Sequence, residues 1–324
     1  MYYPNDIEDI CYQQDHIDKV WDEIGKVLPT YFEKYINTEG GHSVTTDEIE
    51  KLAAKFGSTS KPKNKPKDIG EILKFLLNEA IYSYEKERPV YQEILDLESL
   101  EEYKYDVNSF KNTVLKNEIP LIRRTLQNKQ AKELDKFRGA FNSAQPGYLF
   151  EVTSNIVRSA YELHNEWYEE ENFNAIEICD DLEHHEFDAE GYTAFGVIGG
   201  GIKSHFLYKI FPDVYPNRSR EAIWALYYLS NKKKFGCKED SQFLMINAKE
   251  GTTQQNYFYP YGLFSFYALR IFDRLKKSYE ENNLVLPTEY RFVIVDSFLS
   301  FVAKTHQIEI DLLKKKSSGY HYDY

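Results

Sequence analysis

A glycine cluster between apolar segments constrains the fold of this chain more than any other part of its sequence. Residues 192–234 contain Gly196 and Gly199–Gly201, followed by two helical patterns that a turn with Pro212 and Pro216 separates. Glycine adopts backbone conformations with positive φ at little cost and leaves its N–H group uncovered. The segment therefore predicts a tight hinge that another group approaches closely.

The two helices after this hinge have predictable limits. The first is expected over residues 202–211, and the second begins after Pro216, with Asn217 or Ser219 as its N-cap. The second helix is apolar on every side through residues 222–229, so we expect it to be buried.

The start of the first helix is a candidate phosphate-binding site. Free N–H groups at a helix N-terminus attract anions, and residues 196–234 carry seven lysines and arginines against two acidic residues. The whole chain has a formal net charge of −12, which argues against indiscriminate binding to nucleic acid. The residues predicted to hold a phosphate are Gly199, Gly200, Gly201, Lys203, Ser204, Arg218 and Arg220. The alternative is that these charges line exposed faces and that the glycines only permit close helix packing.

Hydrophobic periodicity predicts a mainly α-helical protein with two parts. With 324 residues, 42% of them hydrophobic, the chain is long enough to bury a core in each part. We expect a helical N-terminal region over residues 1–139 that includes a linker at 58–67. A larger helical core domain is expected over residues 148–313, with a small β-hairpin near 243–259, and residues 314–324 form a mobile tail.

Some local patterns make predictions that a structure can test. An amphipathic helix is expected from about Asp6 to Val27, where Pro29 ends it, and it could dock on the rest of the chain or on a partner. The hairpin strands are predicted at 243–247 and 257–259. Residues 288–304 fit either a strand or a helix.

Composition favours an intracellular protein. No run of 18 apolar residues occurs, and the first ten residues are acidic where a secretory signal is basic and then apolar. Cys11, Cys179 and Cys237 are scattered without CxxC spacing, which favours reduced thiols buried as small apolar groups. We therefore expect a cytoplasmic protein with no membrane partner and no cofactor.

The glycine cluster resembles the helix-hairpin-helix element of the DNA glycosylase and endonuclease III superfamily. The resemblance covers about residues 196–229, with GGGIKS at 199–204 as the glycine hairpin and Lys203 near the Schiff-base lysine of bifunctional members. It implies that a hairpin between two helices binds a nucleic-acid backbone. The family places an essential aspartate before the next helix, where this chain has Asn217, which cannot act as a carboxylate.

The same segment also approaches the phosphate-loop pattern of nucleotide-binding proteins. Gly196 precedes Lys203 and Ser204, but Ile202 inserts one residue between the last glycine and the lysine. Residues 293–296 could supply the accompanying acidic strand, yet the intervening segments lack the alternating strands and helices of a parallel sheet.

A further helix is predicted over residues 174–187, in the densest titratable cluster of the chain. Glu177, Asp181, His184 and Asp188 follow at steps of four, three and four, so they would share one helical face and could bind a hard or borderline metal. No second histidine-rich helix matches this spacing, and a solvated acidic face is the alternative.

Arg158 and His164, on a helix predicted over residues 149–171, fit the loose Arg-x(4–6)-His signature of HEPN ribonucleases. Six helical steps place the two side chains about 120° apart, so they converge only through a partner chain or a distorted helix. They are catalytic candidates together with Lys203, and a packed core histidine is the alternative.

The sequence thus predicts a nucleic-acid-associated protein that binds a phosphate backbone through residues 199–204, Arg218 and Arg220. Its context could be bacterial DNA processing or phage defence. The alternatives are a helical subunit of a protein complex or homo-oligomer, and a HEPN-like ribonuclease. Whether the chain is an enzyme stays open at this point.

Overall fold

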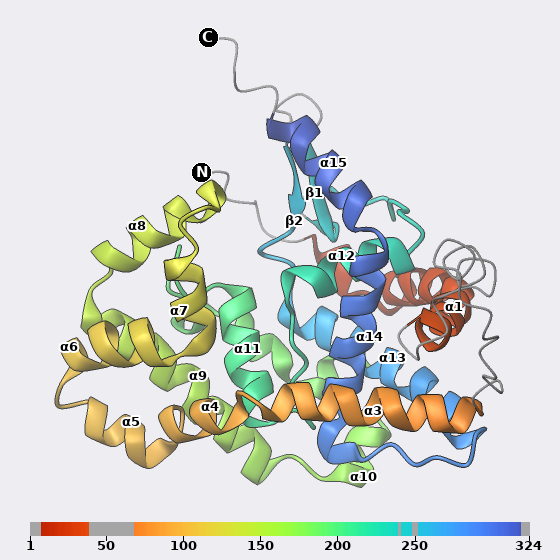
Figure 1. Ribbon diagram of the computed structural model, residues 1–324, viewed down its shortest axis with the longest axis horizontal. Coiled ribbons are helices and arrows are strands. Elements are labelled where there is room, and N and C mark those ends of the chain that lie inside the picture. The colour runs from red at the N-terminus through yellow and green to blue at the C-terminus, as the bar shows by residue number, and fades with distance from the viewer. Residues whose placement is uncertain (1–7, 39–67, 239–240, 248–251, 319–324) are drawn as a thin grey trace, which may run out of the picture.

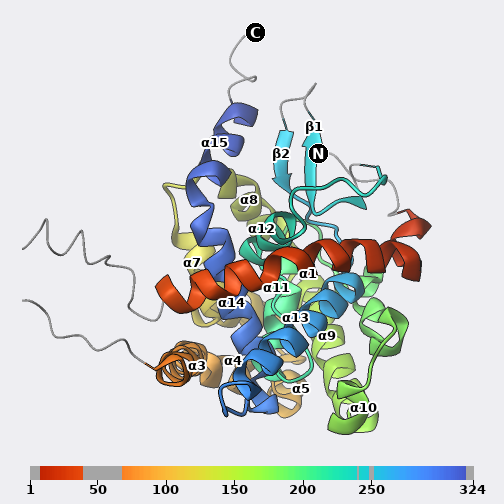
Figure 2. The ribbon, with the colours of Figure 1, turned by 90° about the vertical axis from the view of Figure 1, so that its right-hand side faces the viewer.

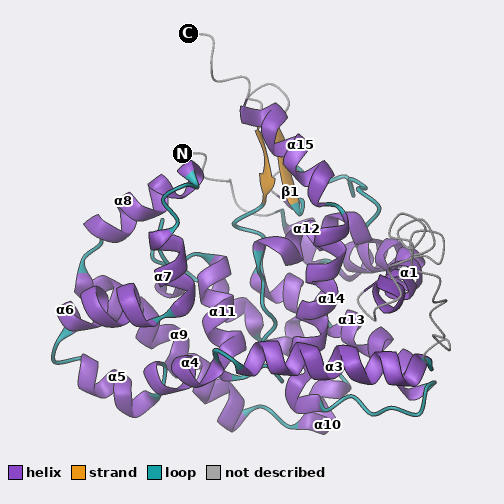
Figure 3. Cartoon of the chain, in the orientation of Figure 1, coloured by secondary structure: helices purple, strands orange, loops and turns teal. Residues whose placement is uncertain are grey.

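The protein is mainly helical in its computed structural model, which describes residues 8–38, 68–238, 241–247 and 252–318 (Figure 1). One small antiparallel hairpin accompanies the helices (Figure 3), so the predicted fold class is confirmed. The predicted linker at 58–67 and the end of the predicted tail, residues 319–324, lie outside the described residues.

The elements follow one another in chain order. The helices up to residue 166 are α1 (Gln14–Asn37), α3 (Ile69–Glu85), α4 (Arg88–Ile94), α5 (Leu97–Tyr103), α6 (Val107–Ser109), the π-helix η3 (Phe110–Glu118), α7 (Pro120–Gln127), α8 (Asp135–Ser143) and α9 (Pro146–Glu166). The later helices are α10 (Glu170–Asn174), α11 (Gly200–Ile210), α12 (Arg220–Leu229), α13 (Tyr261–Glu280), α14 (Arg291–Thr305) and α15 (Gln307–Ser318). Short 3-10 turns are η1 (Asp9–Tyr12), η4 (Lys132–Leu134), η5 (Cys179–Leu182), η6 (His184–Asp188), η7 (Glu190–Tyr192) and η9 (Thr288–Tyr290), and the strands are β1 (Leu244–Asn247) and β2 (Thr252–Gln255).

Helix α14 forms the centre of the larger part of the fold. Helices α1, α3, α12 and α13 all pack against it (Figures 1 and 2). Its residues are apolar on nearly every side, and such a helix is stable only where neighbours cover each face. The ambiguity over residues 288–304 is thereby resolved, because a 15-residue helix fills most of this stretch.

The smaller part of the fold is built around α9, which packs against α5, α6, η3 and α11. Helix α11 also contacts α4 and lies between the two groups of helices in Figure 1. The buried hydrophobic residues form one cluster from Cys11 to Ile310. The two parts predicted over residues 1–139 and 148–313 therefore share one core. No helix among the described residues is long and apolar enough to cross a bilayer.

Helix α1 docks on the chain itself, against α12 and α14 (Figure 2). The prediction that Pro29 ends it is wrong, since the helix continues to Asn37. Ile24 and Leu28 before the proline and Phe32 after it are all buried on the side that faces the core. This packing outweighs the hydrogen bond that proline removes from a helix interior.

The hairpin is present, but its second strand is displaced from the predicted position. Leu244 pairs with Gln255 and Asn247 with Thr252, so β2 occupies 252–255 and not 257–259. Tyr259 is instead buried, with its ring 4.8 Å from that of Phe243.

Two further predictions need correction. Residues 174–187 do not form one helix, because α10 ends at Asn174 and the turns η5 and η6 follow, separated by Glu183 with a left-handed φ of 54°. The predicted mobile tail begins too early, since α15 extends to Ser318.

Candidate functional site

The predicted phosphate site does not have an open helix end. Lys203 is only 3% exposed, and its Nζ donates hydrogen bonds to the backbone oxygen of Phe187 and to Thr193 Oγ1. Burial lowers the pKa of Lys203 to about 8, an effect that the carboxylate of Asp188 opposes and the charge of Arg218 reinforces. Lys203 is therefore an internal cation of the fold.

Arg218 fills the space in front of the first turn of α11. A Cβ at Gly200 would meet its Nη1 at 1.9 Å, so only glycine permits this approach. The guanidinium of Arg218 donates to the backbone oxygen of Asn256 at 2.9 Å. The backbone N–H of Arg218 donates to Ser204 Oγ at 3.0 Å. The expected anion site is thus closed by a buried arginine. Ser219, not Asn217, caps α12 by accepting from the backbone N–H of Ala222.

The basic island, meaning the seven lysines and arginines of residues 196–234, is largely buried or ion-paired within the fold. Its buried members are Lys203, Lys209 and Arg218. Its exposed members include three that pair with carboxylates, namely Arg220 with Glu221, Lys232 with Glu309 and Lys233 with Glu23. Gly199 is the N-cap residue of α11, and Gly201 is exposed in the first turn of that helix. A patch of free cations is not present at this segment among the described residues.

Arg158 and His164 do not converge on one site. Arg158 forms an exposed ion pair with Glu101. The imidazole of His164 stacks on Phe211, with ring centroids 3.9 Å apart, and lies 3.4 Å from Asp213. The HEPN-like pair is therefore split between a surface contact and a packed aromatic cluster.

The four predicted metal ligands are also separated. His184 is buried and stacks on Tyr261, and burial lowers its pKa to about 3. Asp188 accepts hydrogen bonds from the backbone N–H groups at the start of α13, whereas Glu177 and Asp181 are exposed. Within the described parts of the chain, three potential ligands meet only at Cys11, His16 and Cys237.

A cleft of about 530 Å³ lies between α3, α11 and α14, with contributions from the end of α1 and from Asn217. Its volume falls within the range of small-molecule sites, about 300–1,000 Å³. Its aromatic residues are Tyr35, Phe75, Tyr84, Tyr208 and Phe301. Its polar and charged residues are Glu79, Ser83, Glu87, His205, Lys209, Asn217, Asp296, Ser297, Ser300 and Lys304.

Asp296 lies in the wall of this cleft, on the central helix α14. Asn217 Nδ2 donates to its Oδ1 at 3.0 Å. Burial raises the pKa of Asp296 to about 7, although the hydrogen bond from Asn217 and the charge of Lys209 oppose this shift. Solvent still reaches part of the residue through the cleft. The carboxyl group is thus neither fully charged nor fully neutral near neutral pH.

Lys209 and His205 lie on the face of α11 toward the same cleft. Lys209 Nζ donates to the backbone oxygen of Tyr84 at 2.8 Å and lies 4.3 Å from the centre of its ring. Burial lowers the pKa of Lys209 to about 8 and that of His205 to about 3. Asn217 also faces His205, but its amide oxygen and the imidazole Nε2 form no hydrogen bond of normal geometry.

This arrangement provides two groups, Asp296 and Lys209, whose protonation changes near neutral pH. Groups with such pKa values are suited to proton transfer and are concentrated at functional sites. The amide oxygen of Asn217 and the imidazole Nε2 of His205 are buried in the wall of the cleft, where the two side chains face each other. The cleft is therefore the candidate functional site.

Comparison of the chain with protein-family models, curated proteins and solved structures found no match in any of the three. The cleft geometry is consequently the basis for assigning a function.

Sequence reasoning missed this cleft, although one signal for it exists. Asp296 is the only acidic residue within residues 291–305, RFVIVDSFLSFVAKT, and a lone carboxylate in an apolar helix is often functional because its burial is costly. The local sequence presents Asn217 only as a cap or as a substitute for an aspartate. Its contact with Asp296 spans 79 positions of the sequence, so no local pattern indicates it.

Proposed function

We propose that this chain binds a small molecule that carries a nucleobase, in the cleft between α3, α11 and α14. The observation that carries the proposal is the hydrogen-bonded pair of Asp296 and Asn217 in the wall of an aromatic-lined cavity.

Complementary hydrogen bonding supports a nucleobase. The edge of a base presents donors and acceptors side by side, which asparagine and carboxyl side chains recognise in proteins. The carboxyl group of Asp296 can donate or accept because its pKa is about 7, and the hydrogen bond from Asn217 Nδ2 holds it in the cleft wall. Ser297 and Ser300 add hydroxyl groups on the same helix for the remainder of the ligand.

The aromatic lining supports a planar ligand. Phe75 is 48% exposed in the cleft wall, whereas the rings of Tyr35 and Phe301 are buried and pack on each other, with centroids 5.2 Å apart. A base stacked on an aromatic side chain gains about 1–3 kcal/mol. A cavity of about 530 Å³ has room for a sugar as well as a base.

A panel of adenosine, guanosine, cytidine and uridine tests the proposal at pH 7. We expect at least one nucleoside to raise the melting temperature of the protein, because a ligand that binds only the folded state stabilises it. The variant Ser300→Phe places a ring in the cleft and is expected to remove this shift.

The matched control is Ser278→Phe, which places the same ring on α13 outside the cleft. It should leave the nucleoside-dependent shift unchanged. A shift that persists in Ser300→Phe would place the ligand elsewhere, and no shift with any nucleoside would contradict the proposal.

A second candidate function is binding to nucleic acid through a different surface from the glycine hairpin. Residues 111–138 contain eight lysines and arginines against three acidic residues, on a chain of net charge −12. The exposed cations of this segment include Lys116, Arg123, Lys129, Lys132 and Lys136. Clustered cations of this kind bind phosphate backbones in a salt-dependent manner.

Fluorescence anisotropy with a single-stranded RNA and a DNA duplex tests this candidate at low and high salt. If the segment binds, replacing both Lys129 and Lys132 with glutamate should weaken binding at least tenfold and reduce its salt dependence. The control Arg220→Glu, at the originally predicted site, should have little effect. Equal losses in the two variants, or no binding by the parent protein, would argue against the candidate.

A further inference from the structure

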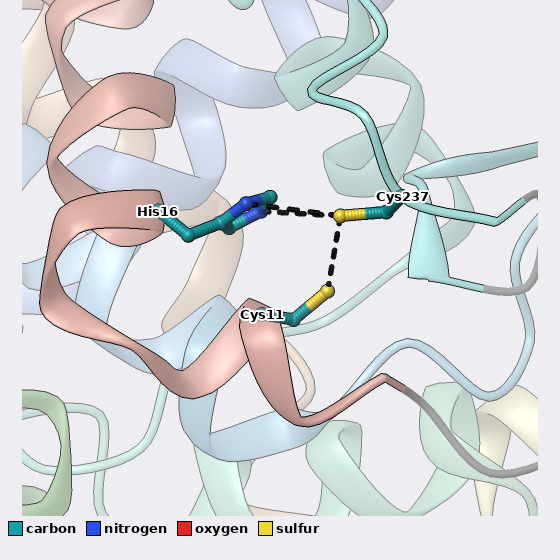
Figure 4. A group of neighbouring side chains, drawn as sticks. All are labelled: Cys11, His16 and Cys237. Atoms are coloured by element: carbon teal, nitrogen blue, oxygen red, sulfur yellow. Dashed lines mark hydrogen bonds between the residues drawn. The ribbon is translucent and has the colours of Figure 1, made fainter.

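Two cysteines and a histidine from distant parts of the sequence meet beside the N-terminal helix (Figure 4). Cys11 lies in the turn η1, His16 in the first turn of α1, and Cys237 in the segment between α12 and β1. The Sγ atoms of Cys11 and Cys237 are 3.5 Å apart, and Cys237 Sγ lies 3.7 Å from each ring nitrogen of His16.

The two distances to Cys237 Sγ are close to the edges of a tetrahedral zinc site. Zinc binds cysteine sulfur at about 2.3 Å and histidine nitrogen at about 2.0–2.1 Å. In a tetrahedron such bonds separate two sulfurs by about 3.8 Å and a sulfur from a nitrogen by about 3.5 Å. The ligand atoms of all three residues lie within 4.8 Å of one another, so an ion can contact each of them after small side-chain rotations.

The surroundings of Cys11, His16 and Cys237 favour a metal-binding role for them over simple packing. Cys11 and His16 are buried, and cysteine sulfur and histidine nitrogen are ligands that zinc takes in proteins. The 3.5 Å between the sulfurs exceeds the roughly 2.05 Å of a disulfide bond, and both thiols are free. Glu8 also lies beside the group, where its carboxylate accepts from the backbone N–H of Lys238.

We propose that Cys11, His16 and Cys237 bind a zinc ion that ties the N-terminal segment to the segment after α12. The fourth position would be taken by water or by the carboxylate of Glu8. The ion would join residues 226 positions apart in the sequence, a cross-link that stabilises the docked N-terminus. The group lies outside the cleft between α3, α11 and α14.

Metal analysis of the intact chain, purified without chelators from zinc-supplemented cells, tests the proposal. We expect about one zinc per chain in the wild type and less than about a tenth of that in the double variant Cys11→Ser/Cys237→Ser, since removing two ligands abolishes a three-residue site. Cys179→Ser is the matched control, because Cys179 is a buried cysteine outside the group, and it should retain the metal.

A second measurement keeps the test informative if the double variant does not fold. After a chelator has removed any bound metal from the wild-type protein, titration with Co²⁺ should produce the intense visible absorption bands of a tetrahedral ion with thiolate ligands. In His16→Ala these bands should be weaker or absent. A wild type without metal that shows no such bands would overturn the proposal. So would a mass about 2 Da lower that maps to a Cys11–Cys237 disulfide, or full zinc content in the double variant.

Discussion

Replacing Asp296 with asparagine is expected to make the protein more stable at pH 8 while it weakens binding in the cleft. The pKa of Asp296 rises from 3.8 to about 7 on folding, so the folded state holds this proton more tightly than the unfolded state. Below pH 3.8 both states are protonated, and the carboxyl group costs little. As the pH rises from about 4 to 7, the unfolded state loses this proton while the folded state keeps it, which destabilises the wild type by about 2–4 kcal/mol. Above pH 7 the loss is complete, and asparagine does not have it.

Thermal unfolding of the wild type and Asp296→Asn between pH 4 and pH 8 measures this effect. The two melting temperatures should converge near pH 4 and separate as the pH rises, by about 2 °C for each kcal/mol in a chain of this size. A constant difference across the range would contradict the assigned pKa.

Asp296→Asn should weaken nucleoside binding in the cleft although it stabilises the folded protein at pH 8. Loss of the carboxyl group removes a buried hydrogen bond to the ligand, so we expect nucleoside affinity to fall about 10- to 100-fold. Asp273 provides the control, because burial also raises its pKa but it does not line the cleft. Asp273→Asn should leave affinity unchanged. A gain in stability with a loss of binding is typical of functional sites.

Gly200→Ala is expected to destabilise the protein by about 2–4 kcal/mol, because the buried guanidinium of Arg218 would be displaced and left without its partner. The new Cβ would lie 1.9 Å from Nη1 and 2.9 Å from Cζ of Arg218. The side chain is enclosed, since Arg218 is only 4% exposed, so it cannot move aside without losing its hydrogen bond to Asn256.

The neighbouring Gly201 gives a control of opposite sign. A Cβ there would meet its nearest atom, the backbone oxygen of Arg218, at an ordinary 3.9 Å. Gly201→Ala should therefore stabilise the protein slightly, by up to about 1 kcal/mol, because alanine favours the helix. Denaturant unfolding measures both variants. Equal effects would show that Arg218 does not occupy the space in front of α11.

The sequence predicted the helical fold class because apolar periodicity is a local property. It also indicated the buried helix over 222–229 and the presence of a hairpin. It failed where tertiary packing decides the outcome. Nothing near Pro29 indicates that a continuous buried face carries α1 past it, and nothing near Gly200 indicates that a guanidinium, and not a phosphate, lies in front of α11.

The candidate sites were harder to predict because their members are remote in sequence. The cleft joins α3, α11 and α14, and only Asp296 stands out locally as a charge in an apolar helix. The contact between Cys11 and Cys237 spans 226 positions, so scattered spacing concealed a group that the fold assembles. Lys203 is the opposite case. A local motif predicted a ligand site there, but the buried ammonium group hydrogen-bonds to the backbone of Phe187.

Calorimetric titration at pH 7 with the nucleoside that gives the largest rise in melting temperature tests the central claim most directly. The account predicts saturable binding at a single site in the wild type and in Asp273→Asn, and affinity weakened at least tenfold in Asp296→Asn. Failure of all four nucleosides to bind saturably, or an equal dissociation constant in Asp296→Asn, would contradict it.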